Sequence, residues 1–395
     1  MKLNTVIIYL IFIILALGAI SPLLAYFTMG ILFTVLIGYK QEKVIWKFLL
    51  ENKILLLMII SMVFSSLFSE LPYISILFSI LYIMKVLFGV TISCYLNEEH
   101  HNKIINLLMC LGIIVSSIGI FQYFHDGYMP KSWIDNNTYN INFRAYSTFF
   151  NPNILSVFLN LVILSGVVWI EYNKNNKDNF LAALCIILST ICQLFTYSRN
   201  GWMSLCVSFI AMSLNNKKYM KYAVLFLVIF ITFDFLGDTG RLLPQNIIAD
   251  SSLDYRIKIW TAALKIIKDN LIIGIGTGTF WEKAPLYSDE IKSYVSHAHN
   301  IFLQKLLDAG TVGLFLFIWF IKYLWNIIKE NTHKGKCINT IAFGFFVTLL
   351  SNGFLDAICF QAQISIYVWT FIGVSLNKKV ELELTCDLLS RENVL

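Results

Sequence analysis

Long apolar runs dominate this chain, and each is about as long as a membrane is thick. Roughly 20 apolar residues let a helix cross a bilayer core, and about twelve such runs follow one another here. Charged residues are 14% of the chain and apolar residues 57%, which is far less charge than a soluble domain carries. The sequence therefore predicts an all-α, polytopic integral membrane protein and excludes a cytosolic enzyme. The runs lie near 4–20, 22–39, 48–68, 73–95, 104–121, 152–171, 180–197, 201–215, 222–237, 299–326, 338–353 and 357–376.

Lysine predicts how these runs are oriented, because it falls in alternate short connections. The positive-inside rule assigns such connections to the cytoplasm, so both termini are expected there and two long segments, roughly 122–151 and 238–298, outside. The lysines that set this orientation are Lys40, Lys43, Lys47, Lys103, Lys174, Lys177, Lys217, Lys218, Lys221, Lys329, Lys334, Lys336, Lys378 and Lys379. The predicted parts are 1–121, amino-terminal helices; 122–237, central helices with the first outer loop; 238–298, the large outer loop; and 299–395, carboxy-terminal helices and cytoplasmic tail.

Arginine is distributed differently from lysine. The chain has 25 lysines and five arginines, of which only Arg391 falls in the expected cytoplasmic tail. Guanidinium offers a planar fork of donors that suits phosphate oxygens and keeps its charge. Arg144, Arg199 and Arg256, on the expected outer face, therefore predict an anionic ligand at the outer leaflet. For Arg241, on the same face, headgroup contact or a loop salt bridge is preferred.

The segment around Arg256 predicts an amphipathic helix in the large outer loop, lying on or against the membrane. Its apolar stripe at helical spacing consists of Leu253, Ile257, Trp260, Leu264 and Ile267. Arg256 falls at the opposite edge, beside Ile259 and Ala263. A cation there needs an anion unless it reaches lipid headgroups. The glycine run at 274–278 is expected to be a tight loop rather than a phosphate loop.

Ionisable residues also mark the start of the tenth run. His299 is expected at the outer membrane boundary, level with Arg199, as a general base, a hydrogen-bond donor or a plain interfacial residue. The pair His297 and His299 could suggest a metal, but no acidic or cysteine partner has supporting spacing. Lys305 and Asp308, at i and i+3, are expected to pair with each other.

Two further features concern the inside of the bundle. Gly310 and Gly313 are expected to let another helix pack closely against the tenth run. Lys85 lies in the middle of the fourth run, where an ionisable residue indicates a functional site by default. Lys85 could instead satisfy a carboxylate inside the bundle.

Four motifs in this order resemble the O-antigen ligase and O-antigen polymerase superfamily of bacterial membrane glycosyltransferases. They are the segment 144–153, the turn 196–202, Arg256 and Trp260 before the glycine run, and His299-Asn300 leading into a helix through Asp308, Gly310 and Gly313. The resemblance covers roughly residues 140–315. The chain departs from it by lacking a proline before the glycine run and by carrying Asp308 where glutamate is more common.

The resemblance implies a GT-C-like fold that moves a glycan from an undecaprenyl pyrophosphate carrier to an acceptor hydroxyl at the outer leaflet, with no cofactor and no metal. It implies that Arg199, Arg256 and His299 are catalytic. Departure of a diphosphate builds negative charge, which fixed cations stabilise, and His299 is the best-placed base for the acceptor hydroxyl. Substrate-binding roles are expected for Arg144, Asn300, Trp260 and Lys85.

Three functions stay open at this point. A polymerase of surface polysaccharide (O-antigen or capsule) is preferred, because the outer loop is modest in size. An O-antigen ligase acting on lipid A core is the alternative within the class. A transporter or flippase of lipid-linked sugars is the alternative of another class, disfavoured because the halves show no internal repeat. The expected location is the bacterial cytoplasmic (inner) membrane; the expected partners are the lipid-linked donor, a glycan or lipid-linked acceptor, the bilayer and a chain-length regulator, with no nucleic acid.

Overall fold

The computed structural model describes residues 3–125, 141, 143–173, 179–237, 240–242, 251–291 and 295–377, and these ranges contain helices and no strand. The helices in chain order are α1 Leu3–Ile20, α2 Pro22–Gly38, α3 Glu42–Glu51, α4 Lys53–Leu67, α5 Pro72–Tyr95, α6 Glu98–Phe124, η2 Ser147–Phe149, α7 Pro152–Tyr172, α8 Asn179–Phe195, α9 Arg199–Asn215, η3 Lys217–Tyr219, α10 Met220–Leu236, α12 Ser251–Asp269, α13 Phe280–Tyr287, α14 Ile301–Thr332, α15 Cys337–Gly353, η4 Ile358–Phe360 and α16 Ala362–Leu376. The prediction of an all-α protein is therefore confirmed for the described residues.

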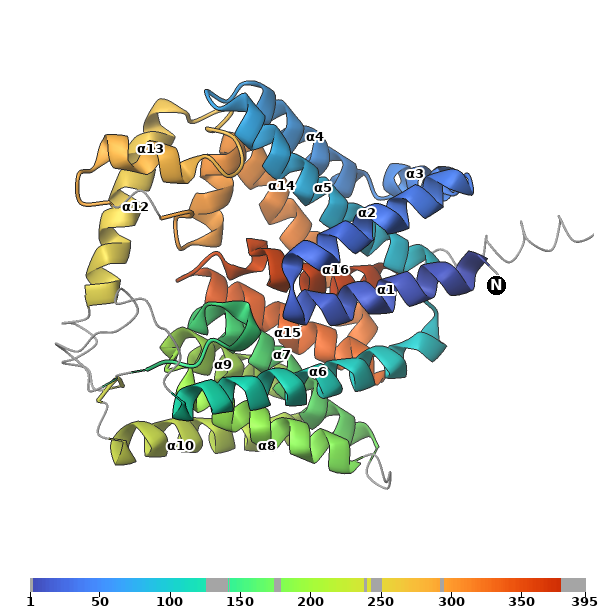
Figure 1. Cartoon of the computed structure of the whole chain (residues 1–395), viewed down its shortest axis with the longest axis vertical. Coiled ribbons are helices and arrows are strands. Elements are labelled where there is room, and N and C mark those ends of the chain that lie inside the picture. Colours follow the sequence, from blue (N-terminus) through green and yellow to red (C-terminus); the bar gives the residue numbers. More distant parts are fainter. Residues whose placement is uncertain are drawn as a thin grey trace, which may run out of the picture.

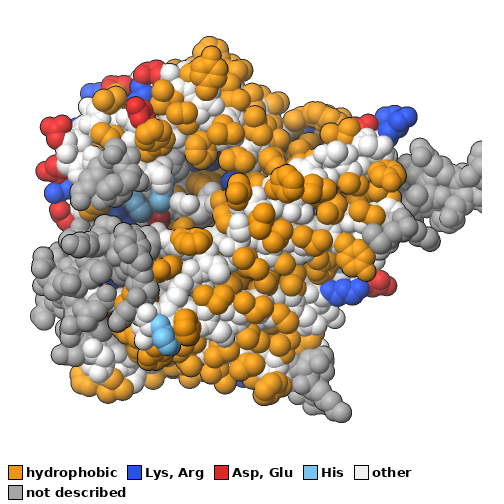
Figure 2. All heavy atoms as spheres, viewed as in Figure 1, with side chains coloured by type: hydrophobic (Ala, Val, Ile, Leu, Met, Phe, Trp, Pro, Cys, Tyr) orange, Lys and Arg blue, Asp and Glu red, His pale blue; other side chains and the backbone are white. Residues whose placement is uncertain are grey.

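Most of these helices form one bundle, and α12 and α13 lie at one end of it (Figure 1). Six described helices are long and apolar enough to cross a membrane, or seven if α2 and α3, which meet at 101°, form one broken span. Four shorter apolar helices, α4, α8, α15 and α16, accompany them. Hydrophobic side chains cover the flank of the bundle seen in Figure 2, as expected of a polytopic membrane protein. Every predicted run overlaps helical residues, but 48–68 is divided between α3 and α4 and 357–376 between η4 and α16. Twelve crossings stay a prediction.

Helix α7 lies at the centre of this bundle and is buried along most of its length. Polar side chains join it to its neighbours: the Asn160 amide donates to the Gly201 carbonyl oxygen at 2.9 Å and accepts from the Gln193 amide at 2.9 Å. A Cβ on Gly201 would lie 1.6 Å from the Ser156 hydroxyl oxygen, so only glycine allows α9 to approach α7 this closely. This close contact fixes where α9 begins, and with it the position of Arg199.

Helix α12 is amphipathic, as predicted, but it buries a different face. Ile259, Ala263 and Ile266 are fully buried in a small apolar cluster that includes residues of α13. Ile257 and Leu264, which belong to the predicted stripe, are 51% and 56% exposed. The face opposite these two residues packs against other parts of the chain, and contact of the stripe with the membrane stays a prediction. The buried face is the one that carries Arg256, so the chain turns this arginine inward.

Helix α14 is interrupted at Ala309 and Gly310, where Gly310 has φ +63°. The segment before α13 lies against this break: the Thr311 N–H donates to Leu271 and the Ile275 N–H donates to Leu307. A Cβ on Gly310 would lie 2.1 Å from the Ile272 carbonyl oxygen. Gly310 therefore admits a loop rather than the neighbouring helix that the sequence predicted. The glycine run forms a tight turn as predicted, because its three glycines have φ between +75° and +90°.

The predicted pair between Lys305 and Asp308 is wrong. Among the described residues no ion pair joins them, although both are buried. Asp308 accepts a hydrogen bond from the Gln304 amide at 2.8 Å, and the Lys305 ammonium lies 3.2 Å from the Met62 sulfur. Each side chain has another hydrogen-bond partner, and both line one cavity.

Several predictions lie outside the described residues. They concern 126–140 and 142 in the first predicted outer loop, 238–239, 243–250 and 292–294 in the second, Lys174 and Lys177, and the tail with Lys378, Lys379 and Arg391. The division of the chain into four parts also stays a prediction.

Candidate functional site

The site lies at the end of the bundle that carries α12, where α9 and α14 begin with the same local turn. Tyr197 and His299 both have φ +49°, in the left-handed region that costs an ordinary residue about 1–2 kcal/mol. The next residue in each case caps the helix: Ser198 accepts from the Gly201 N–H, and Asn300 accepts from the N–H groups of residues 302 and 303. Helix capping stabilises these turns, which set Arg199 at the first position of α9 and His299 just before α14.

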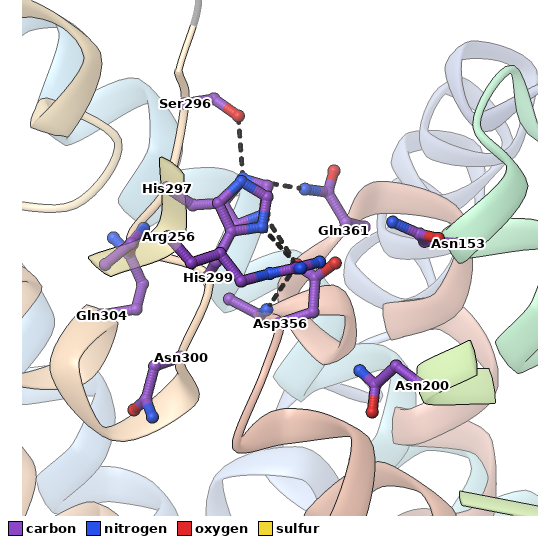
Figure 3. A network of polar contacts seen from close by, with 12 residues as sticks. Asn153, Asn200, Arg256, Ser296, His297, His299, Asn300, Gln304, Asp356 and Gln361 are labelled. Carbon is purple, nitrogen blue, oxygen red and sulfur yellow. Dashed lines mark hydrogen bonds and ion pairs between the residues drawn. The ribbon is translucent and has the colours of Figure 1, made fainter. Parts of the chain in front are cut away.

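A buried carboxylate joins the two histidines. Asp356, in the loop between α15 and α16, accepts at one oxygen, Oδ1, from His297 Nε2 at 3.0 Å and from His299 Nδ1 at 3.1 Å (Figure 3). The Ala357 N–H donates to the same oxygen at 2.8 Å. The sequence analysis missed Asp356, because it follows His299 by 57 positions and lies in a short turn without a recognisable motif.

These contacts assign different states to the two imidazoles. His297 donates to Asp356 through Nε2, so its Nδ1 is an acceptor, and Ser296 and Gln361 donate to it at 2.9 and 3.5 Å. His299 donates to Asp356 through Nδ1, so its Nε2 carries a lone pair. Within the described part of the chain, nothing hydrogen-bonds to that Nε2. His299 is therefore the imidazole that is ready to accept a proton.

Burial and charge determine the protonation of this cluster. Burial lowers the pKa of His299 below its ordinary value, although the charge and hydrogen bond of Asp356 raise it, and the positive charge of Arg256 lowers it further. Burial alone would raise the pKa of Asp356, but His299 and His297 hold it well below its ordinary value. The resulting pair is a neutral imidazole held by a carboxylate, which is the arrangement of a general base.

Three side chains hold the segments around this pair. The Trp260 indole N–H donates to the Ala298 carbonyl oxygen at 2.9 Å and so ties α12 to the histidine segment. The Asn300 amide donates to the Phe354 carbonyl oxygen at 3.0 Å, and the Asn200 amide donates to the Asn352 carbonyl oxygen at 3.0 Å. These bonds position the loop that carries Asp356. The substrate contacts predicted for Trp260 and Asn300 stay a prediction.

Four arginines line a cavity of about 170 Å³ beside this loop. They are Arg144, Arg199, Arg241 and Arg256, and the described lining contains no aspartate or glutamate. The structure thus brings together the three arginines that the sequence grouped and adds Arg241, for which headgroup contact or a loop salt bridge was preferred. Segment 240–242 folds back to α10, because both Asp234 carboxylate oxygens accept backbone N–H groups of Arg241 and Leu242.

Each arginine is anchored while it lines the cavity. Arg144 donates to the Thr196 carbonyl oxygen and to the Asn153 amide oxygen, and Arg241 donates to the Tyr197 carbonyl oxygen at 2.8 Å. Arg199 donates to the Arg241 carbonyl oxygen at 3.2 Å. The backbone carbonyl oxygens of residues 196 and 197 therefore hold two of the four guanidinium groups in place.

Arg256 and Arg144 give the clearest indication of a ligand. Arg256 donates from Nη1 to the Ser252 hydroxyl at 2.8 Å, but its buried Nε has no partner among the described residues. Burial and the neighbouring charges of Arg241, Arg256 and Arg199 lower the pKa of Arg144 well below its ordinary value. Guanidinium nevertheless keeps its charge in proteins. An anion with several oxygens would relieve the repulsion and accept the vacant N–H group.

Lys85 lies elsewhere. It lines a second cavity, together with Lys305, Asp308 and His297, and contributes nothing to the arginine cavity. The structure therefore separates Lys85 from the other predicted site residues, with the histidine pair between the two cavities: Leu355 lines the arginine cavity and Ala357 lines the second one.

His297, His299 and Asp356 also form a possible set of metal ligands. One donor atom from each lies within 4.8 Å of the others, and imidazole and carboxylate are ligands that Zn²⁺ accepts. The sequence analysis expected no metal because it found no acidic partner, and the structure supplies one. At 3.0 and 3.1 Å the same atoms are at ordinary hydrogen-bond distances. Hydrogen bonds therefore account for the cluster as well as a metal would.

A helical membrane bundle with a cationic cavity beside an imidazole–carboxylate pair defines a membrane protein equipped to act on an anionic, hydroxyl-bearing substrate. Residues 184–318, about a third of the chain, match the family model described as O-Antigen ligase. The matched region contains Arg199, Arg256 and His299, and the match supports membership of the O-antigen ligase superfamily, which confirms the resemblance predicted from the sequence. The match supports an enzyme of surface polysaccharide synthesis that uses lipid-linked glycan and acceptor substrates. None of the curated proteins matches this chain.

Proposed function

We propose that this protein is a polymerase-type glycosyltransferase that moves a glycan from an undecaprenyl pyrophosphate carrier to an acceptor hydroxyl. The observation that carries the proposal is the arginine cavity, with its four guanidinium groups, beside an imidazole whose free nitrogen can take a proton. A diphosphate suits this cavity because its oxygens accept several charge-assisted hydrogen bonds at once. We place the site on the outer face of the bacterial inner membrane, with both termini cytoplasmic, as the lysines predict.

The proposed reaction is a single displacement at the anomeric carbon. His299 Nε2 takes the proton of the acceptor hydroxyl while its oxygen forms the new bond to that carbon. The bond from carbon to the diphosphate oxygen breaks on the opposite side, so the anomeric configuration inverts and the electron pair stays on the diphosphate. Arg144, Arg199 and Arg256 stabilise the charge that develops there. The products are the extended glycan and the carrier diphosphate, and the proton leaves His299 to solvent.

Purified protein in vesicles that contain carrier-linked glycan tests the proposal. We expect longer glycan chains on the carrier without any ion or voltage gradient. Movement of intact lipid-linked sugar across the vesicle, with no new glycosidic bond, would instead establish a flippase. In cells that lack the protein, a surface glycan that carries one repeat unit distinguishes a polymerase from a ligase, whose loss removes the whole glycan.

Asp356→Asn is expected to lower the transfer rate at least about tenfold, because asparagine can no longer stabilise the imidazolium that forms at His299. The base must be neutral to act, so wild-type activity is expected to fall toward acid pH. Because the pKa of His299 lies below the ordinary imidazole value of about 6.5, this acid limb of the pH profile should lie below that pH. Loss of Asp356 removes a charge that raises this pKa, so the acid limb should move to still lower pH. Transfer rates between pH 5 and 8 measure both effects, and an unmoved limb would assign Asp356 a structural role.

Chelation is expected to leave transfer unchanged, because the arginines supply the positive charge that a metal would otherwise provide. The measurement compares the rate before and after incubation of the purified protein with EDTA and dialysis. A loss of activity that Zn²⁺ or Mg²⁺ restores would assign His297, His299 and Asp356 to a metal instead.

A further inference from the structure

The second cavity has a volume of about 250 Å³ and shares no lining residue with the arginine cavity. It is bordered by α5, the start of α14, the glycine run and the loop after α15. Its lining includes two lysines, Lys85 and Lys305, and one carboxylate, Asp308. His297 also lines it, and is therefore the link between this cavity and the proposed base.

Lys305 is 2% exposed, and its ammonium is held in place without a carboxylate. Its Nζ lies 5.2 Å from the centre of the Tyr82 ring, 5.8 Å from that of Phe317 and 5.1 Å from that of Phe360. The Met62 sulfur accepts one of its three N–H groups. Two donors remain on a buried cation, whose attraction to aromatic faces orients it.

Lys85 has no hydrogen bond or ion pair within the described ranges. Asp308 forms no ion pair with either lysine among the described residues and accepts from Gln304, although its single negative charge acts on both ammonium groups. The cavity thus holds two ammonium groups with free donors and one carboxylate that has a different partner. An isolated cation inside a membrane protein is costly, and an anionic ligand between the two lysines would offset that cost.

An apolar crevice between α14, α15 and α16 adjoins this cavity. The two share Tyr82, Lys85 and Phe360 in their linings. The crevice has a volume of about 80 Å³, and apart from Lys85 and Ser365 its lining is apolar or aromatic. Its lining includes residues of α14 from Ile301, two positions after His299, to Ile328. A hydrocarbon chain fits such a lining, whereas a water-soluble ligand gains nothing from it.

The lining of the lysine cavity also contains groups that suit a sugar. Trp281 and Tyr26 offer aromatic faces, and Gln304 and Gln361 offer amides. A few convergent polar groups among aromatic ones are typical of sites that orient a small polar ligand. The two linings together offer apolar, cationic and sugar-compatible groups, which match the tail, phosphate and sugar of a lipid-linked glycan.

We propose that Lys85 and Lys305 bind the phosphate groups of a second lipid-linked substrate, whose tail follows the crevice and whose sugar reaches the histidine pair. The inference rests on the proposed function and assigns this second cavity to the acceptor, with the arginine cavity left to the donor. It makes the acceptor a carrier-linked glycan, as a polymerase requires. The shared chemistry, a lipid phosphate, could also come from an anionic phospholipid, and the test separates the two.

Binding of radiolabelled undecaprenyl pyrophosphate to the full chain in phosphatidylcholine nanodiscs tests the site. We expect two equivalents per chain in the wild type and one in either Lys85→Met or Arg256→Ala. Loss of a charge-assisted contact should weaken binding to the lysine cavity at least about tenfold. Lys85→Arg keeps the cation and should restore the second equivalent, and Lys329→Met, at the far end of α14, is the matched control.

Two outcomes would overturn the assignment. One equivalent in the wild type, unchanged by Lys85→Met, excludes a second carrier site. Displacement of the second equivalent by phosphatidylglycerol, with unaltered transfer in Lys85→Met, makes the cavity a phospholipid site. In the transfer assay Lys85→Met should raise the acceptor KM about tenfold or more and leave the donor KM unchanged. Failure of the proposed function differs from failure of this site assignment, because in the former case Arg256→Ala and His299→Ala would retain full transfer.

Discussion

His299→Ala is expected to lower the transfer rate by about 10²- to 10⁴-fold, the usual contribution of a general base, while donor binding stays intact. The reason lies in the hydrogen bonds of the site. Asp356 fixes the proton of His299 on Nδ1, which leaves Nε2 as the acceptor, whereas both nitrogens of His297 already have partners. Alanine removes the acceptor and keeps the arginine cavity, since His299 does not line it.

The measurement is the initial rate of chain extension, together with the affinity for undecaprenyl pyrophosphate. His333→Ala is the matched control, because His333 is an exposed imidazole at the opposite end of α14. Equal rates for His299→Ala and the wild type would remove the base from the mechanism. A loss of carrier binding together with rate would show that His299 holds the donor instead.

The positions of the helices could be predicted from the sequence because apolar run length alone determines them. Ten of the twelve predicted runs coincide with one helix each, and the other two, 48–68 and 357–376, are each divided between two helical elements. The break in α14 could not be predicted in this way. Gly310 is compatible with a helix that packs closely, and only the arrival of the segment 271–275 shows that it admits a loop.

The arginines and His299 could be predicted as a group because each lies beside an apolar run on one expected face. Asp356 could not, since a single acidic residue in a short turn carries no periodic signal, and its importance arises from two contacts formed in three dimensions. The face of α12 that packs on the chain could not be predicted either. The helix has a second apolar face with Ile259, Ala263 and Ile266, and only the contacts formed in three dimensions show that this face is buried.

Arg256→Ala is expected to lower the transfer rate by about 10²- to 10³-fold, the effect of removing one donor that stabilises developing charge. Arg256 combines three properties: it lines the arginine cavity, its buried Nε has no partner among the described residues, and its charge acts on His299. It is therefore the guanidinium best placed to join the leaving diphosphate to the base. Arg256→Lys should recover only part of the rate, because an ammonium keeps the charge but lacks the planar fork.

Lys258→Ala provides the matched control for Arg256, since it removes a cation two residues away on α12. The Lys258 ammonium is ion-paired with Asp254 and Glu290 at 3.2 and 3.0 Å, away from the cavity lining. Single-turnover rates with carrier-linked donor should separate the two variants, with Lys258→Ala close to the wild type. If Arg256→Ala also transfers glycan at the wild-type rate, the cavity does not stabilise the leaving group. If instead it loses only donor affinity, Arg256 binds the diphosphate equally before and during its departure, and the catalytic stabilisation must come from Arg144 and Arg199.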